Sequence, residues 1–531
     1  MANRDVEATS SYHDGTKHSY QSVRAGARGL DWANQPLPFK IYSTLEPLPL
    51  PRDFPPPAMP ALDAIATSAT APPDHRIPDI RTLAGLLYFS AGITKRVRRR
   101  GGTMDFRAAA CTGALYHIEL YLICGELPGL AAGVYHFGVH DFALRRLRAG
   151  DHRGHVVDAS GAEPSIAAAP AILICTTTFW RNAWKYRARA YRHAFWDSGT
   201  ILANLLAVSA AYGVPSHLVC GFVDVEVNRL LDLDTEHEVA IALVALGRHG
   251  ISSGAARSGG RQNVQPVPAL GFPTEPLSRT EVDYPAIRAM HAASSLRTPD
   301  DVIAWRGAGL SADSETAGGA APPAGRFIPL QPLPPEEVPQ DSIARVIRRR
   351  GSSREFAPAP ITFGQLSTML DRTTRVIPAD FLDAPQQSSE SGAALNTMYL
   401  IVHAVEGLSS GAYVFHRDRR GLELLKEGSF REEAGYLGLE QELPATAAVN
   451  VYFLTALASI LDRFGNRGYR VAQLDAAIAG GKLYLAAYAL RLGATGLTFY
   501  DDDVTKFFSP HAAGKSVTFL VALGKPARLR Y

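Results

Sequence analysis

The chain has 531 residues, of which 46% are hydrophobic and 20% are charged, so it can build one large or two ordinary hydrophobic cores. Its formal net charge of +3 is too small to indicate nucleic-acid binding. Because the amino terminus is polar and no apolar run is long enough to span a bilayer, the sequence predicts a cytoplasmic protein without membrane contact.

The first part of the chain is predicted to hold a proline-rich segment and a domain. Residues 1–60 are rich in proline and predict an extended segment that wraps a surface. Residues 61–255 predict a first domain. Its expected elements are a helix at 81–92, strands at 118–124, 133–137 and 171–176, a long apolar helix at 197–212 and a closing strand at 239–246.

The rest of the chain is predicted to hold a linker and a second domain. Residues 256–335 are rich in Gly, Ser, Ala and Pro and predict a linker with one short helix at 284–291. Residues 336–531 repeat the helix, strand, helix, strand order of the first domain. The fold class is therefore α+β, with a mostly antiparallel sheet flanked by helices.

Sequence blocks from the first domain return in the second. Tyr121-Leu122-Ile123 recurs 278 residues later as Tyr399-Leu400-Ile401, and Tyr191-Arg192 with Asp197 recurs at the same spacing as Tyr469-Arg470 with Asp475. The segments 244–247 and 521–524 both read Val-Ala-Leu-Gly. Blocks in the same order at nearly constant spacing indicate a duplication, which makes the chain an intramolecular pseudo-dimer.

The cysteines and the acidic clusters give no sign of a metal site. Cys111, Cys124, Cys175 and Cys220 lack CxxC spacing and predict buried thiols in a reducing compartment. The run 501–503 is all Asp, but no His or Glu cluster accompanies it, so a helix-capping loop explains it.

The densest motifs resemble a known family. They are Trp184-Lys185-Tyr186, Tyr191-Arg192, Asp197-Ser198-Gly199 and Ala203-Asn204-Leu205-Leu206 in the first copy and 350–356, Arg-Gly-Ser-Ser-Arg-Glu-Phe, in the second. The chain resembles the SagB/ThcOx-type dehydrogenases of the nitroreductase-like, FMN-dependent oxidoreductase superfamily, in a tandem form. The resemblance implies the nitroreductase-like fold and FMN bound at the interface of the two copies.

A flavin phosphate needs fixed positive charge and directional donors. Arg350, Ser352 and Arg354 offer both within a few residues and match the family's flavin-phosphate motif, although a solvated basic helix end would look the same. Lys17, His18 and Ser19 are taken as the weaker counterpart in the first copy. Arg248 and Lys525, which follow the closing strands, are further phosphate candidates.

Small residues before the first strand of each domain predict flavin contact. Cys111, Thr112 and Gly113, and in the second copy Ser391 and Gly392, would let the backbone approach a planar ring, although a simple turn has the same composition. Asn204 and Gly221 are added to the expected cofactor contacts from the resemblance.

Lys185 and Tyr186 are the expected catalytic pair. The family's Lys-Tyr pair falls on these positions, and 278 residues later stand Arg463 and Phe464, which can neither accept nor donate a proton in catalysis. Lys185 needs a lowered pKa to act as a base. The alternative without a catalytic role is a surface lysine beside a core tyrosine. Asp197, which is kept in both copies, predicts an architectural role.

The resemblance implies a two-electron oxidation of a peptide or small heterocyclic substrate, such as an azoline converted to an azole. An NAD(P)H-dependent nitro- or quinone reductase and a partly degenerate flavin-binding scaffold remain alternatives. The sequence leaves open the substrate, whether one or two flavins bind, and any further oligomer.

Overall fold

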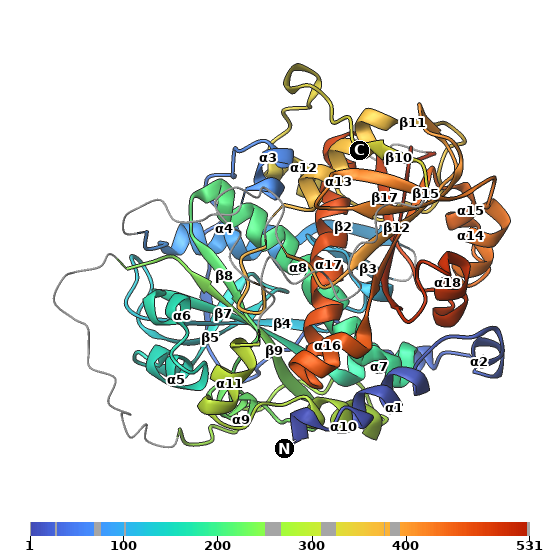
Figure 1. Ribbon diagram of the computed structural model, residues 1–531. Helices are drawn as coiled ribbons and strands as arrows, with labels where there is room; N and C mark the ends of the chain where they lie inside the picture. The colour runs from blue at the N-terminus through green and yellow to red at the C-terminus, as the bar shows by residue number, and fades with distance from the viewer. Residues whose placement is uncertain are drawn as a thin grey trace.

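The computed structural model describes residues 2–26, 29–67, 76–99, 102–249, 267–308, 325–375, 377–382 and 393–527, without the side chain of Arg99. Within these ranges the chain forms two halves that lie side by side (Figure 1).

Each half is built on a seven-stranded sheet in which every strand pairing is antiparallel. The first sheet has the order β1-β6-β5-β4-β7-β9-β8 and the second β10-β15-β14-β12-β16-β18-β17. The strands of the first are β1 (Pro47–Pro49), β4 (Ile118–Cys124), β5 (Gly133–Gly138), β6 (Ala143–Ala149), β7 (Ala171–Thr178), β8 (Ser216–Val219) and β9 (Glu238–Leu246). Those of the second are β10 (Phe327–Pro329), β12 (Thr397–Val402), β14 (Gly411–His416), β15 (Gly421–Glu427), β16 (Val449–Thr455), β17 (Gly493–Gly496) and β18 (Ser516–Gly524). The two sheets therefore share one topology, and the predicted nitroreductase-like α+β fold is confirmed.

Two small sheets differ between the halves. The first half has the antiparallel hairpin β2 (Ile93–Arg99) and β3 (Gly102–Arg107), and the second has a parallel pair, β11 (Ile361–Thr362) and β13 (Val405–Glu406).

Helices cover the sheets and fill the space between the halves. Those of the first half are α1 (Glu7–Gly15), α2 (Tyr20–Ala25), α3 (Ala61–Ala66), α4 (Ile80–Ala91), α5 (Arg153–Ala159), α6 (Pro164–Ala168), α7 (Phe179–Tyr186), α8 (Ala190–Tyr212) and α9 (Asp224–Leu230). Those of the second are α10 (Pro285–Ala293), α11 (Pro299–Arg306), α12 (Ile343–Arg349), α13 (Phe363–Thr373), α14 (Arg431–Leu437), α15 (Glu442–Thr446), α16 (Leu457–Phe464), α17 (Arg467–Ala489) and α18 (Asp501–Phe508). Short 3-10 helices lie at Ala2–Arg4, Trp32–Asn34, Thr112–Ala114, Arg187–Arg189 and Pro335–Glu337. Among these helices, none in the described ranges has the length and apolarity needed to cross a membrane.

The predicted long apolar helix is α8, and it packs against its counterpart α17 at the centre of the molecule (Figure 1). Glycines bring the two backbones close: a Cβ on Gly199 would come within 2.4 Å of the Ala477 Cβ, and one on Gly481 within 2.6 Å of the Ala203 Cβ. Residues all round both helices are buried, which is the pattern of a helix enclosed between two domains. The interface between the halves is therefore a core.

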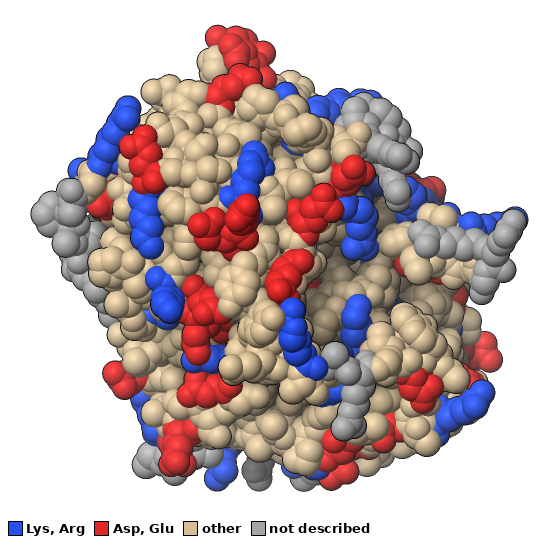
Figure 2. Space-filling view, turned by 90° about the vertical axis from the view of Figure 1, so that its right-hand side faces the viewer, with Lys and Arg blue, Asp and Glu red and all other residues tan. Residues whose placement is uncertain are grey.

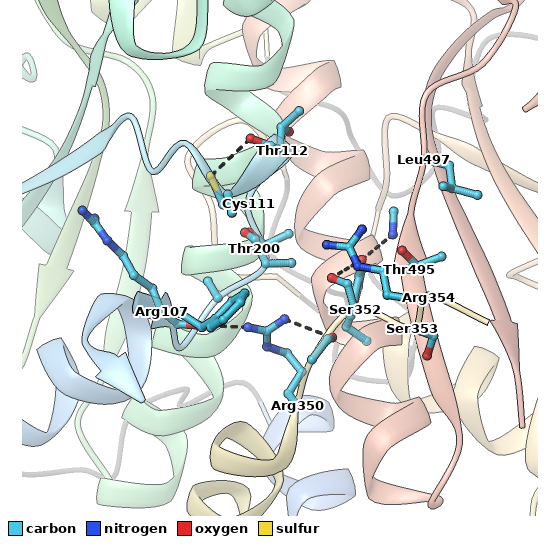
Figure 3. Close-up of a pocket in the computed structure, with 18 of the residues that line it drawn as sticks. Arg107, Cys111, Thr112, Thr200, Arg350, Ser352, Ser353, Arg354, Thr495 and Leu497 are labelled. Atoms are coloured by element: carbon cyan, nitrogen blue, oxygen red, sulfur yellow. Dashed lines mark hydrogen bonds between the residues drawn. The ribbon is translucent and has the colours of Figure 1, made fainter. Parts of the chain in front are cut away.

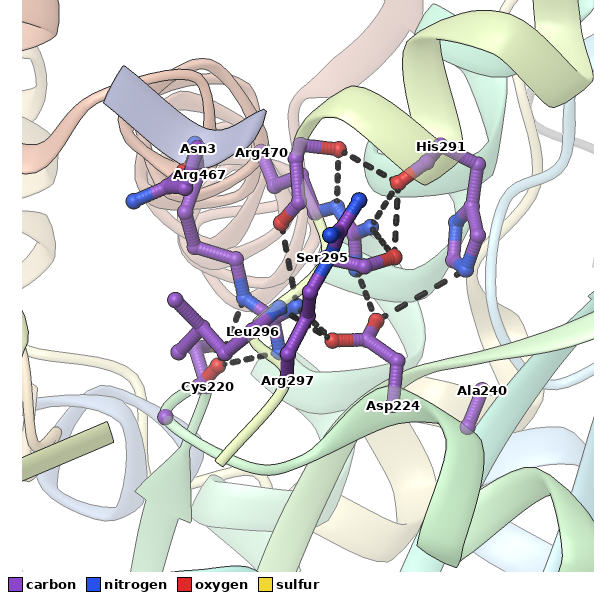
Figure 4. Close-up of polar contacts among 12 residues, drawn as sticks. Asn3, Cys220, Asp224, Ala240, His291, Ser295, Leu296, Arg297, Arg467 and Arg470 are labelled. Carbon is purple, nitrogen blue, oxygen red and sulfur yellow. Dashed lines mark hydrogen bonds and ion pairs between the residues drawn. The ribbon is translucent and has the colours of Figure 1, made fainter. Parts of the chain in front are cut away.

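Reciprocal ion pairs fix the two halves to each other. Arg467 and Arg470 of α17 bind Asp224 at the start of α9 in the first half, at 2.5 and 2.7 Å (Figure 4). Arg189 and Arg192 at the start of α8 bind Asp501 at the start of α18 in the second half, at 2.9 and 2.6 Å. All are buried, and such pairs are costly to break because one charge is then left uncompensated. They therefore fix one arrangement of the two halves.

The expected extended segment at 1–60 is wrong in part, because α1 and α2 form there. Helix α1 is short and mostly polar and buries only Thr9, Tyr12 and His13, so its apolar pattern is too sparse to read from the sequence. The described part of the expected linker at 256–335 contains α10, which confirms the short helix predicted at 284–291, together with α11 and β10. These elements occupy the places of α1, α2 and β1 in the first half: His13 and His291 both offer their backbone oxygen to an α-helical arginine, and β1 and β10 both lie at a sheet edge. The repeated unit therefore includes both segments.

Candidate functional site

A cavity of about 950 Å³ lies between the two halves. Its wall from the first half comprises the β2–β3 hairpin, the loop 109–114, the end of α7 and part of α8. Its wall from the second half comprises the residues after α12, one face of α17 and β17 with the residues that follow it. Figure 3 shows Cys111, Thr112 and Thr200 on one side of this space and Ser352, Ser353 and Arg354 on the other. The site is therefore shared by the halves, as the sequence predicts.

Arg350 joins the two halves at the base of the cavity. Its Nε donates to the Ala108 oxygen at 2.9 Å and its Nη2 to the Arg107 oxygen at 3.0 Å, and both acceptors belong to the first half (Figure 3). Nη1 donates to the Gly351 oxygen at 3.2 Å. The guanidinium group that the sequence assigns to a phosphate is thus already bound to backbone carbonyls.

Two of the next residues, Ser353 and Arg354, have side-chain donors without a partner among the described residues. The buried Ser353 Oγ has no hydrogen-bond partner among the described residues. Arg354 is exposed and makes no ion pair or hydrogen bond in the part of the chain that the structure describes. The Ser352 Oγ is 3.5 Å from the Tyr484 hydroxyl. Ser353, which the motif analysis passed over, is therefore a further candidate, and only its place inside the Arg-Gly-Ser-Ser-Arg run could have pointed to it.

Asp197 holds the loop that forms the opposite wall. Its Oδ1 accepts from the Thr112 backbone N–H at 2.8 Å and from the Thr112 hydroxyl at 2.7 Å, and its Oδ2 accepts from Cys111 Sγ at 2.9 Å. His117 Nε2 lies 2.9 Å from the same Oδ2. The expected architectural role fits these contacts, in which Asp197 binds a loop and a histidine.

Position 113 of this loop requires glycine, both because of its backbone conformation and because a side chain there would approach Tyr186 too closely. Its φ is +63°, and a Cβ there would come within 2.9 Å of the Tyr186 hydroxyl. Burial and the Asp197 carboxylate raise the pKa of the Cys111 thiol well above its usual value, which favours the thiol over the nucleophilic thiolate. The loop therefore offers a close backbone approach and no reactive thiolate.

Lys185 and Tyr186 end α7 at the cavity wall. Lys185 Nζ lies 5.2 Å from the centre of the Tyr186 ring, which packs edge-on to His193 at 4.5 Å. Partial burial, and then the positive charge of Arg354 from the other half, lower the pKa of Lys185. Burial and the nearby Asp197 charge raise the pKa of Tyr186. Lys185 is thus shifted towards the neutral amine, while Tyr186 stays a hydroxyl donor.

The residue after this pair has a strained backbone. Arg187 has φ 51° and ψ −141°, a region that residues with a Cβ rarely adopt, and its counterpart in the second half is Gly465, at φ +65°. The second half uses glycine where the first half retains a strained arginine beside Lys185 and Tyr186.

Four of the other predicted contacts lie outside the cavity wall. The buried Asn204 amide donates to the Phe89 and Ala108 oxygens at 3.0 and 3.1 Å, so it stabilises the fold. Gly221 donates its N–H to Asp380 at 2.8 Å. Arg248 is exposed and pairs through its backbone with Arg76. Lys525 is also exposed, and the following residue, Pro526, lines the cavity in its place.

Lys17, His18 and Ser19 also lie away from the cavity. Lys17 binds Asp14 and Asp502, both at 2.8 Å, and Ser19 caps α2. The backbone N–H of His18 donates to Asp501 at 2.8 Å. These contacts use the donors that the sequence assigns to a phosphate.

The topology places the first-half counterpart of the phosphate motif elsewhere. Pro60 and Ser342 pair across the halves, so α3, which follows Pro60, corresponds to α12. The counterpart of Arg350 to Arg354 therefore follows α3, where residues 67–75 contain no Lys or Arg. Residues 68–75 lie outside the residues that the structure describes. The predicted contacts Ser391 and Gly392 also lie outside them.

The cleft related to this cavity by the repeat is filled by the chain itself. Strand β8 is the counterpart of β17, whose residues Thr495 and Gly496 line the open cavity. Against β8 lies the segment 377–382: the Leu218 N–H donates to the Pro378 oxygen at 2.8 Å, and the Asp380 N–H donates to the Leu218 oxygen at 3.0 Å.

Asp380 belongs to the segment 377–382 and binds backbone N–H groups that follow β8. Its carboxylate accepts from the N–H groups of Cys220 and Gly221, both at 2.8 Å. Burial raises its pKa to about 6. A carboxylate of the chain thus uses backbone donors that the sequence analysis assigned to a cofactor.

Comparison with known proteins agrees with this arrangement. The Nitroreductase family model matches residues 140–248 and 347–525, together more than half of the chain. The chain belongs to the nitroreductase family, which is a class of oxidoreductases.

Three individual proteins show how far the similarity extends. A putative nitroreductase from Anabaena variabilis, solved as a crystal structure, is 26% identical with a TM-score of 0.75, and the match covers 98% of this chain and 99% of that one. A putative nitroreductase of Methanocaldococcus jannaschii is 24% identical over 32% of this chain and 80% of its own length. A chain of the E. coli microcin synthetase McbBCD complex is 24% identical over 32% of this chain and 64% of its own, with a TM-score of 0.29. The first of these shares the whole two-half architecture.

Proposed function

We propose that the chain is an FMN-dependent oxidoreductase of the SagB/ThcOx dehydrogenase type, which removes two electrons from a peptide or small heterocyclic substrate. The observation that carries the proposal is the cavity in which Lys185 and Tyr186 of one half face Arg354 of the other. It rests also on membership of an oxidoreductase family.

The residues present fit FMN. The cavity volume is within the range of cofactor sites. The Ser353 hydroxyl and the Arg354 guanidinium, which have no partner among the described residues, suit a phosphate. The glycine loop at Gly113 allows close approach to a flat ring, and Trp196 and Phe519, whose ring centres are 5.5 Å apart, supply apolar wall. FMN, when bound, supplies the acceptor for two electrons.

The chain itself supplies the groups for proton transfer. Neutral Lys185 accepts the proton from the substrate carbon, and its lowered pKa favours the neutral form relative to an ordinary lysine. Tyr186 keeps its proton and donates a hydrogen bond that orients the substrate. Arg354, whose positive charge lowers the pKa of Lys185, belongs to the second half. Neither half therefore holds a complete site.

An absorption spectrum of the purified protein, followed by mass identification of the released cofactor, tests the proposal. We expect a yellow protein with one FMN per chain, because one of the two clefts is filled. A colourless protein that takes up no added FMN would instead support the scaffold alternative and overturn the proposal.

The direction of electron flow needs a second measurement. Under anaerobic conditions an azoline-containing peptide should bleach the flavin and lose two hydrogen atoms, as detected by mass spectrometry. Rapid bleaching by NADPH with turnover of a nitroaromatic, and none by the azoline, would favour the reductase that the named relatives suggest.

A further inference from the structure

The β2–β3 hairpin has two chemically different faces. Lys95 lies opposite Phe106, Val97 lies opposite Met104, and all four residues line the cavity. On the other face Arg96 binds Asp105 through two hydrogen bonds of 2.6 and 2.9 Å. Because side chains alternate between the faces of a strand, the cavity receives three apolar side chains and one amine.

In the described part of the chain, the β2–β3 hairpin lies at the open cleft and has no counterpart at the other cleft. It lies between α4 and β4, and the corresponding segment of the second half lies between α13 and β12. Of that segment, the described residues 378–380 instead pair with β8 and fill the other cleft. The hairpin is therefore a feature of the open cavity rather than a general part of the repeat.

Lys95 is a cation that the described chain leaves unpaired. It is exposed and makes no hydrogen bond or ion pair among the described residues. Three other cations of the wall are bound by the protein: Arg349 and Arg491 both hold Asp341 at 2.8 Å, and the Arg107 guanidinium donates to the Pro38 oxygen at 2.5 Å. Lys185 and Arg354, which also line the cavity, are assigned above to proton transfer and to the cofactor phosphate. The two carboxylates in the wall are Asp197, which is bound to its loop, and Glu355.

The apolar side chains beside Lys95 remain accessible. Met104 is 43% exposed, and Val97 and Phe106 are partly exposed. On the face of the molecule shown in Figure 2, Lys and Arg are interspersed with Asp and Glu. In the hairpin wall of the cavity, Lys95 instead stands beside the apolar residues Val97, Met104 and Phe106. Such a wall complements a ligand with an apolar body and one negative group.

We propose that the β2–β3 hairpin recognises the substrate, and that the substrate carries a carboxylate beside an apolar ring. The carboxylate binds Lys95 Nζ, and the ring packs on Val97, Met104 and Phe106. This assignment rests on the proposed function, since it places the substrate in the cavity that holds the cofactor.

The test uses the FMN-loaded full chain and two probes, 4-nitrobenzoate and nitrobenzene, which differ by one carboxylate. Their affinities are measured by calorimetry and by perturbation of the flavin absorption band. We expect 4-nitrobenzoate to bind about tenfold more tightly, because one charge-assisted hydrogen bond at an accessible site contributes about that much.

Three variants assign the effect to the hairpin face. Lys95→Met should weaken 4-nitrobenzoate about five- to tenfold and leave nitrobenzene unchanged within about twofold. Arg98→Met removes the same charge from the opposite face of the same strand and should change neither affinity. Met104→Ser should weaken both probes about two- to fivefold through lost apolar contact.

Several outcomes overturn the assignment. Equal affinities of the unmodified protein for the two probes would do so, as would equal losses in Lys95→Met and Arg98→Met, which would indicate a general charge effect. Loss of FMN from Lys95→Met would assign this amine to the cofactor phosphate instead. Failure of the proposed function is seen separately, as absence of FMN from the unmodified protein.

Discussion

The two clefts of this protein start from the same sheet topology and end differently. In one, β17 and the end of α12 border an open cavity with Lys185, Tyr186 and Arg354 in its wall. In the other, β8 is covered by residues 377–382, and Asp380 occupies the backbone donors of Cys220 and Gly221. Because the chain holds two copies of the site, one copy can become structural while the other keeps the side chains that line its cavity. Both copies still support the common core.

The same difference appears in the helix that carries the proposed catalytic pair. Helices α7 and α16 end at equivalent places, but α7 ends in Lys185-Tyr186 and α16 in Arg463-Phe464. Arg463 donates to the Ala308 oxygen, so its guanidinium serves the fold. If one cleft alone is active, substitutions at equivalent positions should have very unequal effects.

The largest effect is expected at Lys185. Lys185→Met removes the proposed base and should lower kcat about 10²- to 10⁴-fold while FMN stays bound. The matched change Arg463→Met, at the equivalent position of the other half, should leave kcat within about twofold. Steady-state kinetics on the two variants test the comparison, and similar losses in both would show that the clefts share catalysis.

A second large effect is expected at Arg350, which links the halves beneath the open cavity. Arg350→Ala leaves the oxygens of Arg107 and Ala108 without their charged donor and should lower the free energy of unfolding by about 2–4 kcal/mol. Urea denaturation measures the loss, and the spectrum reports retained FMN.

The control for Arg350 lies on the helix that precedes it, α12. Arg345 is exposed and pairs with Asp341 at 3.3 Å, so Arg345→Ala should cost less than about 1 kcal/mol. An equal cost for the two variants would mean that Arg350 is not a specific link between the halves.

A smaller effect is expected on the pH profile through Arg354. The positive charge of Arg354 lowers the pKa of Lys185, so Arg354→Gln should raise that pKa. A base works only above its pKa, and the rising limb of kcat/KM should therefore move to higher pH, with activity near pH 8 reduced roughly two- to fivefold. The profile is measured at saturating FMN, and Arg345→Gln should leave the limb in place. If the rising limb of the Arg354→Gln profile does not move, Arg354 does not influence the proton transfer.

The smallest effect is expected in the filled cleft. Burial raises the pKa of Asp380 from 3.8 to about 6, so between these values the folded chain holds a proton that the unfolded chain has lost. This group's contribution to stability therefore falls as pH rises through that window. Asp380→Asn lacks this titration, so its free energy of unfolding relative to that of the unmodified protein should rise by about 2 kcal/mol between pH 4 and pH 7. Urea denaturation at both pH values measures it, and FMN stoichiometry should stay at one per chain. Uptake of a second FMN would instead show that Asp380 alone closes this cleft.

The sequence by itself determined the duplication, the α+β class, the central helices and the position of Lys185 and Tyr186, because these are written in local patterns and in residues repeated at a constant spacing. Periodic apolar residues define α8 and α17 wherever they are placed, and the contrast with Arg463 and Phe464 needs only an alignment of the two copies.

Only the tertiary structure decided which donors remain for a ligand. Arg350 and Arg354 look alike in the sequence, but one meets backbone carbonyls of the other half and the other does not. The fate of Gly221 depends on Asp380, 159 residues away, which folding brings to it. Such assignments depend on segments distant in the chain, and local sequence carries no record of which donor a distant acceptor will reach.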